Sequence, residues 1–455
     1  MQTPTTANTA YGCTSFTWVI SNGYVALQPR LLGDLQLRVW KLTHSILRDT
    51  ASATLRIAVM RSGIRTINSR AQRARLVLHF DVNKTILMVD PASGLSALDV
   101  ATDLVAASAW GTVQGDTWTA LDVPLSVDPP APGAHTFADF AKNILHHGYT
   151  LDAAENRRRK CETRRVQQSF CDEGAPGARF VKLRDLIHES LRANVMPTAA
   201  PSGDAAATAG ISLVPSYFVL LDELLSAKRN VQMIFRTFGG DLDHVVAEHN
   251  AWCTRAEHAG AADLVIREFG TFSRTGPHSN NVELTAVSPD SSGGGVTHVH
   301  GIRAIHDFLE LDPRRCWALT DDYRSWWESH EASSGGKLMP FDPSDADVHH
   351  IFLDDNIGAS TDAVRRLPAA VAEAFARTGV LVERESRASR GEWAGPDRDA
   401  KIVDPQCVAT GTALSYSQLR NIHLVRVDPL SAIFSPSYFV ELVEMCETAR
   451  YGRGP

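Results

Sequence analysis

The sequence has few cysteines, no long apolar run and no excess of positive charge, and each absence narrows the class of protein. Its 455 residues include 7 cysteines, and no two of these have Cys-x-x-Cys spacing. An odd, scattered set of thiols is typical of a reducing compartment, so we expect a cytoplasmic protein. No apolar run approaches the roughly 18 residues that a membrane-spanning helix needs. A net charge of −7 argues against general affinity for nucleic acid or for anionic membranes.

Two common catalytic motifs are also missing. No Gly-x-x-x-x-Gly-Lys-Ser/Thr sequence is present, which excludes a P-loop, and no Gly-x-Ser-x-Gly marks a serine hydrolase. His298-x-His300 and the pair His349-His350 suggest zinc, but no cysteine or acid completes a recognisable zinc spacing. We therefore expect His298 and His300 at the start of a helix.

Residues 1–74 differ from the rest and are expected to form a basic N-terminal extension. Residues 1–75 hold ten Arg and Lys against two acids, Asp34 and Asp49, a charge of +8 that leaves −15 for the remainder. A basic, acid-poor segment is typical of a transit peptide, which would direct the protein to mitochondria or another organelle. The alternatives are a poorly ordered extension or sequence upstream of a start at Met60. Residues 31–47 can form an amphipathic helix.

Two short apolar runs end in acidic residues. Residues 76–80 lead directly into Asp81, and residues 348–353 lead into Asp354 and Asp355. Uninterrupted apolar runs of this length are typical of strands that are buried on both faces of a parallel sheet. The carboxyl ends of such strands gather the chemistry of open α/β sheets. We therefore expect three carboxylates at one rim, which is a ligand set suited to Mg²⁺.

Expected strands alternate with expected helices along the chain, which predicts an α/β fold with a doubly wound parallel sheet of about five strands. The expected strands cover residues 76–80, 231–236, 315–320, 348–353 and 422–427. The expected helices cover residues 96–109, 215–228, 243–255, 361–378 and 435–448, with a largely helical stretch at 136–191. Residues 75–130 and 211–455 would build the core. Residues 131–210 would form a cap insertion ending in a flexible linker at 197–210, and a smaller insertion would lie at about 256–296.

The strand ends carry a motif set that resembles the four-motif signature of the haloacid-dehalogenase-like (HAD) hydrolase superfamily. In chain order these are Asp81 in Asp-x-Asn-x-Thr, then Thr237, then Lys337 after a Gly-rich loop, then Asp354-Asp355. The resemblance spans residues 75–430 as separated short motifs. It implies a HAD-like Rossmannoid core with a large cap.

The resemblance also implies roles for the matching residues. Asp81 would be the nucleophile and a Mg²⁺ ligand, with the Asn83 main-chain carbonyl, Asp354 and Asp355 completing the metal site. Thr237 and Lys337 would hold the transferring group, and Thr85 would brace the loop. A carboxylate that attacks a phosphoryl group needs such cations nearby, because the two carry like charges.

Asn83 departs from the phosphatase form of this signature, which usually has a second aspartate there. An amide does not exchange protons near neutral pH, so general acid–base assistance worth ~10²–10⁴-fold would be missing. We expect a Mg²⁺-dependent phosphohydrolase or phosphotransferase that acts through an aspartyl-phosphate on a small phosphorylated substrate. One alternative is a catalytically weak or inactive binding or scaffold protein. The other is a haloacid-dehalogenase-type hydrolase, because halide leaves without protonation.

Overall fold

The computed structural model describes residues 19–21, 24–26, 74–88, 95–127, 129–142, 153–193, 213–276, 281–288, 295–312, 314–328, 335–357 and 402–452. The chain divides into two units, Met1–Thr66 and Ile67–Pro455. The described residues of the first unit form one antiparallel pair, β1 (Val19–Ser21) and β2 (Tyr24–Ala26). The helices expected at 31–47 and 361–378 and the linker expected at 197–210 lie outside the described residues.

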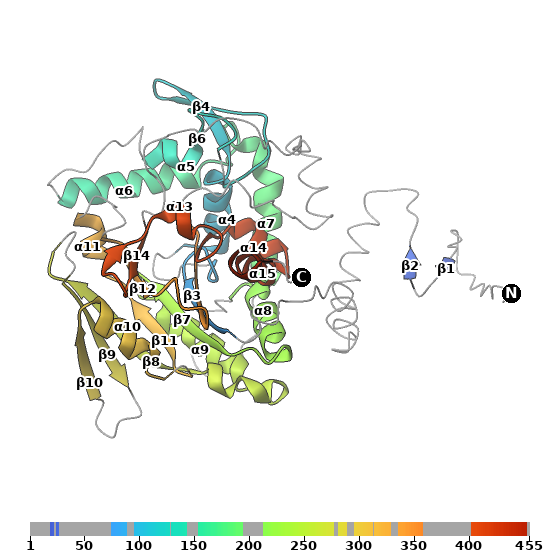
Figure 1. The fold of residues 1–455 in the computed structure, drawn as a ribbon. Coiled ribbons are helices and arrows are strands. Elements are labelled where there is room, and N and C mark those ends of the chain that lie inside the picture. Colours follow the sequence, from blue (N-terminus) through green and yellow to red (C-terminus); the bar gives the residue numbers. More distant parts are fainter. Residues whose placement is uncertain are drawn as a thin grey trace, which may run out of the picture. The chain divides into compact units, whose positions relative to one another are not determined.

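The second unit is built around an eight-stranded sheet with the order β10-β9-β8-β11-β7-β3-β13-β16 (Figure 1). Neighbouring strands from β8 to β16 are all parallel, and β9 and β10 add an antiparallel ribbon beyond β8. The strands are β3 (Arg75–Asp81), β7 (Val231–Thr237), β8 (Ile266–Arg274), β9 (Val282–Ser288), β10 (Gly295–His300), β11 (Cys316–Thr320), β13 (Val348–Asp354) and β16 (Leu424–Arg426).

The five expected strands are present and lie next to one another, which confirms an α/β fold with a mostly parallel sheet. The sheet is wider than the expected five strands, because β8 and β9, which lie within residues 256–296, extend it. The expected helix start at His298 and His300 is wrong. Both residues lie in β10, and the following helix α10 (Ile302–Glu310) begins after Gly301, whose φ of 88° suits glycine.

The chain reverses its direction across the sheet at β3. From β3 it moves to β7 and then to β8, β9 and β10 on one side, comes back to β11 between β8 and β7, and crosses to β13 and β16 on the other side. The carboxyl ends of the strands beside such a switch point form the usual ligand-binding crevice of an open α/β sheet.

Both faces of the sheet are covered. One face buries Leu76, Leu78 and Phe80 against three helices. These are α8 (Pro215–Ser226), α9 (Leu242–Cys253) and α15 (Tyr438–Tyr451). The other face buries Val77 and Ile234 against α10. Because successive side chains of a strand point to opposite faces, His79 and Asp81 belong to the α10 face.

The α10 face also carries a small sheet with the order β12-β14-β15 (Figure 1). Its strands are β12 (Lys337–Phe341), β14 (Val403–Cys407) and β15 (Thr412–Ala413). Met339 and Phe341 of β12 pack against Phe352 of β13, which joins the small sheet to the large one. Elsewhere in the core, the described chain forms α11 (Tyr323–Glu328), α13 (Tyr416–Leu419) and α14 (Pro429–Phe434), with the 3-10 helix η3 (Ala256–Leu264) after α9.

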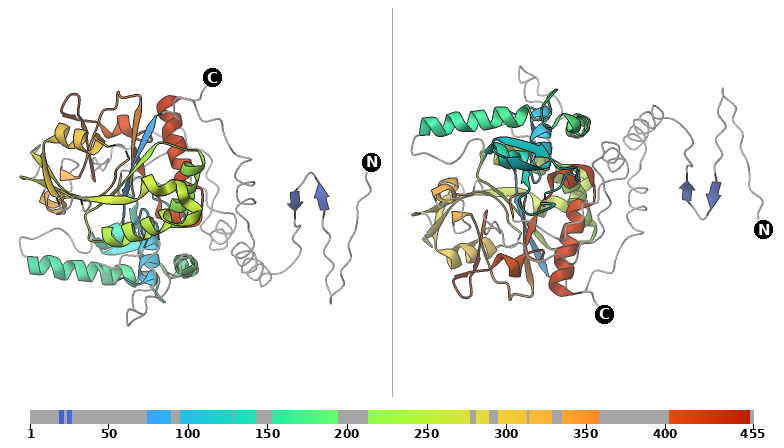
Figure 2. Two further views of the ribbon diagram at one scale, coloured as in Figure 1. Left: turned by 90° about the horizontal axis from the view of Figure 1, so that it is seen from below. Right: turned by 90° about the horizontal axis from the view of Figure 1, so that it is seen from above.

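The part of the chain between β3 and α8 adds a further group of elements. It contains α4 (Ala97–Ala106), the small sheet β5-β4-β6, α5 (Phe137–Phe140), α6 (Ala153–Gln168), η2 (Ala178–Phe180) and α7 (Val181–Ala193). The three strands are β4 (Trp110–Gln114), β5 (Thr117–Ala120) and β6 (His135–Thr136). Phe170 is the aromatic centre of the group, with ring centroids 4.2 Å from Phe137 and 5.7 Å from Trp118. In both views of Figure 2 the long green helix α6 runs along one side of the second unit.

No helix among the described residues combines the length and the apolar character needed to cross a membrane.

Candidate functional site

The register of the parallel strands brings the predicted carboxylates together. Leu353 of β13 pairs with Phe80 of β3, so Asp354 and Asp81 are the next residues on neighbouring strands. On the other side Asp81 pairs with Arg236 of β7, which places Thr237 at the same rim. Strands that run parallel and in register end together, and this is why residues far apart in sequence meet here.

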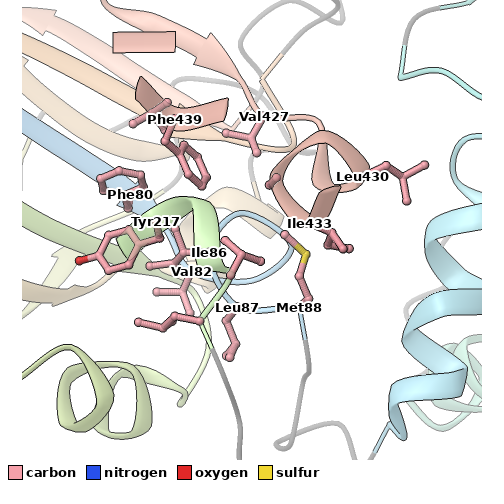
Figure 3. Close-up of a cluster of buried hydrophobic side chains, with 14 of the residues drawn as sticks. Phe80, Val82, Ile86, Leu87, Met88, Tyr217, Val427, Leu430, Ile433 and Phe439 are labelled. Carbon is pink, nitrogen blue, oxygen red and sulfur yellow. The ribbon is translucent and has the colours of Figure 1, made fainter. Parts of the chain in front are cut away.

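The turn after Asp81 is fixed by buried apolar side chains. Val82, Ile86 and Leu87 are fully buried or nearly so, and Figure 3 shows them packed beside Tyr217 of α8 and Ile433 of α14. The Ile86 and Leu87 amides both donate to the Val82 carbonyl, at 3.1 and 2.9 Å. This packing holds Lys84 at φ 61°, a left-handed conformation that non-glycine residues seldom adopt. The turn therefore presents Asn83 and Lys84 in one defined arrangement.

Thr85 braces the site, as predicted. Its hydroxyl donates to Asp81 Oδ2 at 3.2 Å and accepts from the Asp355 amide at 3.2 Å. The Asn356 amide donates to Asp354 Oδ1 at 2.8 Å. The Thr85 bonds tie the end of β3 to the end of β13, and the Asn356 amide fixes one oxygen of Asp354.

Lys337 reaches the site from β12, where it is the first residue of a strand and is buried. Its ammonium group pairs with Asp81 Oδ1 and lies 2.7 Å from Asp354 Oδ2. The strand is held in place by Arg236, whose Nη1 donates to the Leu338 carbonyl at 2.9 Å. The Phe238 ring centroid lies 5.2 Å from Lys337 Nζ, within reach of a cation–π interaction. Lys337 is therefore a buried bridge between the two acidic strand ends.

Thr237 and Asn83 both contact the turn after β7. The Gly239 amide donates to Thr237 Oγ1 at 2.9 Å, and Asn83 Nδ2 donates to Asp241 Oδ2 at 3.0 Å. A Cβ on Gly239 would lie 3.0 Å from that Asp241 oxygen, 3.4 Å from Thr237 Oγ1 and 3.5 Å from Asn83 Nδ2. A side chain at position 239 would therefore require the Asp241 carboxylate to shift by a few tenths of an ångström. The contact also orients Asn83, because its amide nitrogen faces Asp241 and its oxygen is left as an acceptor.

A cleft of about 230 Å³ opens where these side chains meet. Five of the predicted site residues line it: Asp81, Asn83, Thr237, Lys337 and Asp355. Phe238, Gly239, Lys84, Asn356 and Ile402 complete the lining. Asp354 is fully buried behind the cleft and contacts it through Lys337. None of the described residues within 131–210 lines the cleft, so the described walls come from the α/β core.

The charges in the cleft perturb one another strongly. Burial raises the pKa of Asp81 well above its usual range, and the Asp354 and Asp355 charges raise it further against the opposing charge of Lys337. Burial and the neighbouring Asp354 raise the pKa of Asp355 to about 7. Burial alone would lower the pKa of Lys337, but Asp354 and Asp81 outweigh it and hold the pKa above the usual value. Perturbed, mutually coupled groups in a cleft are typical of functional sites.

The acidic group fits a hard divalent cation. Asp81, Asp354 and Asp355 each offer an oxygen, and these oxygens lie within 4.8 Å of one another. Three carboxylates and one ammonium carry a net charge of −2 when ionised, which a divalent cation would neutralise. Oxygen ligands at this spacing suit Mg²⁺ better than a softer metal. The assignment of Asn83 as a further ligand stays a prediction.

Sequence reasoning missed Asp241 and misjudged the setting of Lys337. Asp241 follows the turn that starts at Thr237, and no pattern in the sequence pairs it with Asn83, 158 residues earlier. Lys337 was expected at the end of a Gly-rich loop, but β12 pairs in parallel with β14 and buries it. Both features depend on contacts between segments far apart in the chain.

Comparison with known proteins adds no relative: no protein-family model matches this chain, and neither does any curated protein or solved structure.

Proposed function

We propose that this protein is a Mg²⁺-dependent phosphohydrolase or phosphotransferase of the HAD-like type, with Asp81 as nucleophile. The observation that carries the proposal is the convergence of Asp81, Thr237, Lys337 and Asp355 on one cleft at the switch point of the sheet. Their order along the chain matches the four-motif order, and each lies at the end or start of a different strand. A cleft lined by carboxylates, the ammonium groups of Lys337 and Lys84 and a hydroxyl suits a small phosphorylated substrate better than an apolar one.

The first step is attack by a carboxylate oxygen of Asp81 on the phosphorus. The P–O bond to the leaving group breaks as the bond to Asp81 forms, which yields an acyl phosphate and an alkoxide or phenolate. The Lys337 ammonium stabilises the charge that develops around the transferred group. The Thr237 hydroxyl accepts from Gly239 and keeps its own hydrogen to donate to a phosphoryl oxygen.

The second step is hydrolysis of the acyl phosphate. Water attacks the phosphorus, the P–O bond to Asp81 breaks, and the products are inorganic phosphate and the free carboxylate. Asn83 orients this water with its amide oxygen, because its nitrogen is held by Asp241. An amide cannot take the proton, so this step is the slower one. A phosphotransferase would replace water with a hydroxyl of the acceptor.

The acidic pair Asp354 and Asp355 explains why the proposed activity would depend on Mg²⁺. Asp81, Asp354 and Asp355 would hold Mg²⁺, which when bound neutralises charge on the phosphoryl oxygens. The half-buried Asp355 lines the cleft, while the fully buried Asp354 anchors Lys337. Each member of the acidic pair therefore has a different task.

The proposal is tested with p-nitrophenyl phosphate and Mg²⁺ in stopped flow. We expect a burst of one equivalent of nitrophenolate followed by slow turnover, with phosphate on Asp81 by peptide mapping. Asp81→Asn should abolish both, while the control Asp185→Asn, at an exposed carboxylate on α7, should change neither. Retained turnover in Asp81→Asn would place the chemistry elsewhere. Halide release from a haloacid without ester cleavage would favour dehalogenation, and no Mg²⁺-dependent turnover on any phosphate ester would favour a binding protein.

A further inference from the structure

A second group of metal-ligating side chains lies on the α10 face of the sheet, toward the start of β13. His306 and Glu310 are four residues apart on α10 and so share one side of the helix. They face His350, the third residue of β13. One ligand atom from each of the three lies within 4.8 Å of the others. His350 Nε2 and Glu310 Oε1 are 3.5 Å apart.

The two imidazoles are each held through one nitrogen. His350 Nδ1 lies 3.2 Å from His79 Nε2, and His306 Nδ1 lies 3.0 Å from Asp307 Oδ1. The other nitrogen of His350, Nε2, is left to face Glu310. Metal-ligating histidines in proteins are oriented in this way, by an outer partner on the nitrogen that does not bind the metal.

The contact with His79 allows His350 to adopt either neutral tautomer. Its side chain is buried, and its Nδ1 makes no hydrogen bond with any described residue. The hydrogen between His79 and His350 can therefore sit on either ring without breaking another hydrogen bond of His79. When His350 donates from Nδ1, its Nε2 presents a lone pair toward Glu310 and His306.

Glu310 is divided between two partners. One of its oxygens, Oε2, pairs with the Arg75 guanidinium, and the other, Oε1, faces His350. Arg75 is itself fixed, because its Nη1 donates to Gln232 Oε1 at 3.0 Å. The carboxylate is thus oriented by a buried network that leaves Oε1 available as a ligand.

We propose that His306, Glu310 and His350 bind a Zn²⁺ ion, with the fourth position open to water. Two imidazoles and one carboxylate form a known class of zinc ligand set. Two ligands at about 2.1 Å in a tetrahedron lie about 3.4 Å apart, close to the 3.5 Å between His350 Nε2 and Glu310 Oε1. His306, whose side chain is 19% exposed, closes the set from the solvent side by a side-chain rotation.

The site is separate from the acidic cleft and does not rest on the proposed phosphoryl transfer. His350 lies four residues before Asp354 on the same strand, so the two groups are at different levels of one sheet face. Their donor chemistry also differs, because Mg²⁺ selects oxygen ligands and Zn²⁺ accepts imidazole nitrogen. Zinc would join α10 to β13 and so fasten a helix onto the central sheet.

The experiment measures Zn²⁺ binding to the full chain by competition with a chromophoric chelator, in saturating Mg²⁺ to fill the acidic cleft. We expect one equivalent of bound zinc. His306→Ala should weaken it by more than the roughly 10–100-fold that loss of an outer partner costs. The matched control is the double substitution His298→Ala and His300→Ala on β10, an exposed histidine pair that faces Glu283. This control should bind zinc as the wild type does.

Two further measurements keep the result decisive. Co²⁺ in place of Zn²⁺ should give the visible absorption of a tetrahedral site in wild type and control but not in His306→Ala. His306→Gln, which keeps the side-chain volume, should lose binding in the same way, with an unchanged circular dichroism spectrum. Absence of a zinc equivalent in the wild type, its retention in both His306 variants, or its loss in the β10 control would overturn the proposal.

Discussion

The contact between Asn83 and Asp241 makes a quantitative prediction about proton transfer. Asn83 Nδ2 donates to Asp241 Oδ2 at 3.0 Å, so Asn83→Asp would place two carboxylates against each other. Two unit charges about 4 Å apart repel by roughly 4 kcal/mol at an effective dielectric constant near 20. That energy corresponds to roughly 3 pKa units, so the pair should hold one shared proton up to about pH 7.

The charge-neutral exchange removes this repulsion. In the double variant Asn83→Asp with Asp241→Asn, the amide at position 241 donates to the carboxylate at position 83. The introduced carboxylate should then titrate near the ordinary value of ~4. Both variants gain a base that takes a proton from the attacking water, which is worth ~10-fold or more in hydrolysis of the acyl phosphate. They should differ in the pH at which the gain appears.

The assay is single-turnover decay of the phosphorylated enzyme between pH 5 and 9. We expect the decay of phosphorylated Asn83→Asp to become faster as pH rises, with an apparent pKa of about 7. The decay rate of the exchanged pair should not change with pH near neutrality. Asp241→Asn alone, which adds no base, should not exceed wild type. Identical pH profiles for the two variants would show that positions 83 and 241 are not in contact. No acceleration in either would show that Asn83 does not face the reacting water.

Three other outcomes follow from the same structure. Mg²⁺ should raise the melting temperature of the wild type, and the increase should be larger at pH 8 than at pH 6. The double substitution Asp354→Asn and Asp355→Asn should abolish this increase. The pH dependence arises because Asp355, with a pKa raised to about 7, binds a proton in the folded protein that Mg²⁺ must displace. This bound proton stabilises the folded protein fully below the pKa of the unfolded chain, and that stabilisation is lost as pH rises through about 7. Asp321→Ala should lower the free energy of urea unfolding by roughly 3–5 kcal/mol, because it strands the buried Arg236 guanidinium, whereas Asp185→Ala on the surface should cost under about 1 kcal/mol. Deleting residues 1–59 should leave a cooperatively unfolding protein with unchanged midpoint, since the chain divides after Thr66; a broad, non-cooperative transition would contradict this.

The sequence alone determined the elements that depend on local pattern. Apolar runs such as residues 76–80 bury both faces of a strand, and an uninterrupted run of that kind is readable without knowing its neighbours. Helices with clear ends were equally readable: Ser96 caps α4 with a capping box, and Pro215 begins α8. The carboxylates at the strand ends were predicted because parallel strands of one sheet share a rim.

The groups that lie between those strand ends depend on long-range packing. β8 carries alternating buried and exposed residues beside the antiparallel β9, a pattern that does not distinguish a sheet extension from an insertion. Asp241 meets Asn83, and His350 meets His306 and Glu310, across gaps in sequence that no local spacing records. Such meetings are set by strand order and register, which arise from the packing of the whole sheet rather than from the residues on either side.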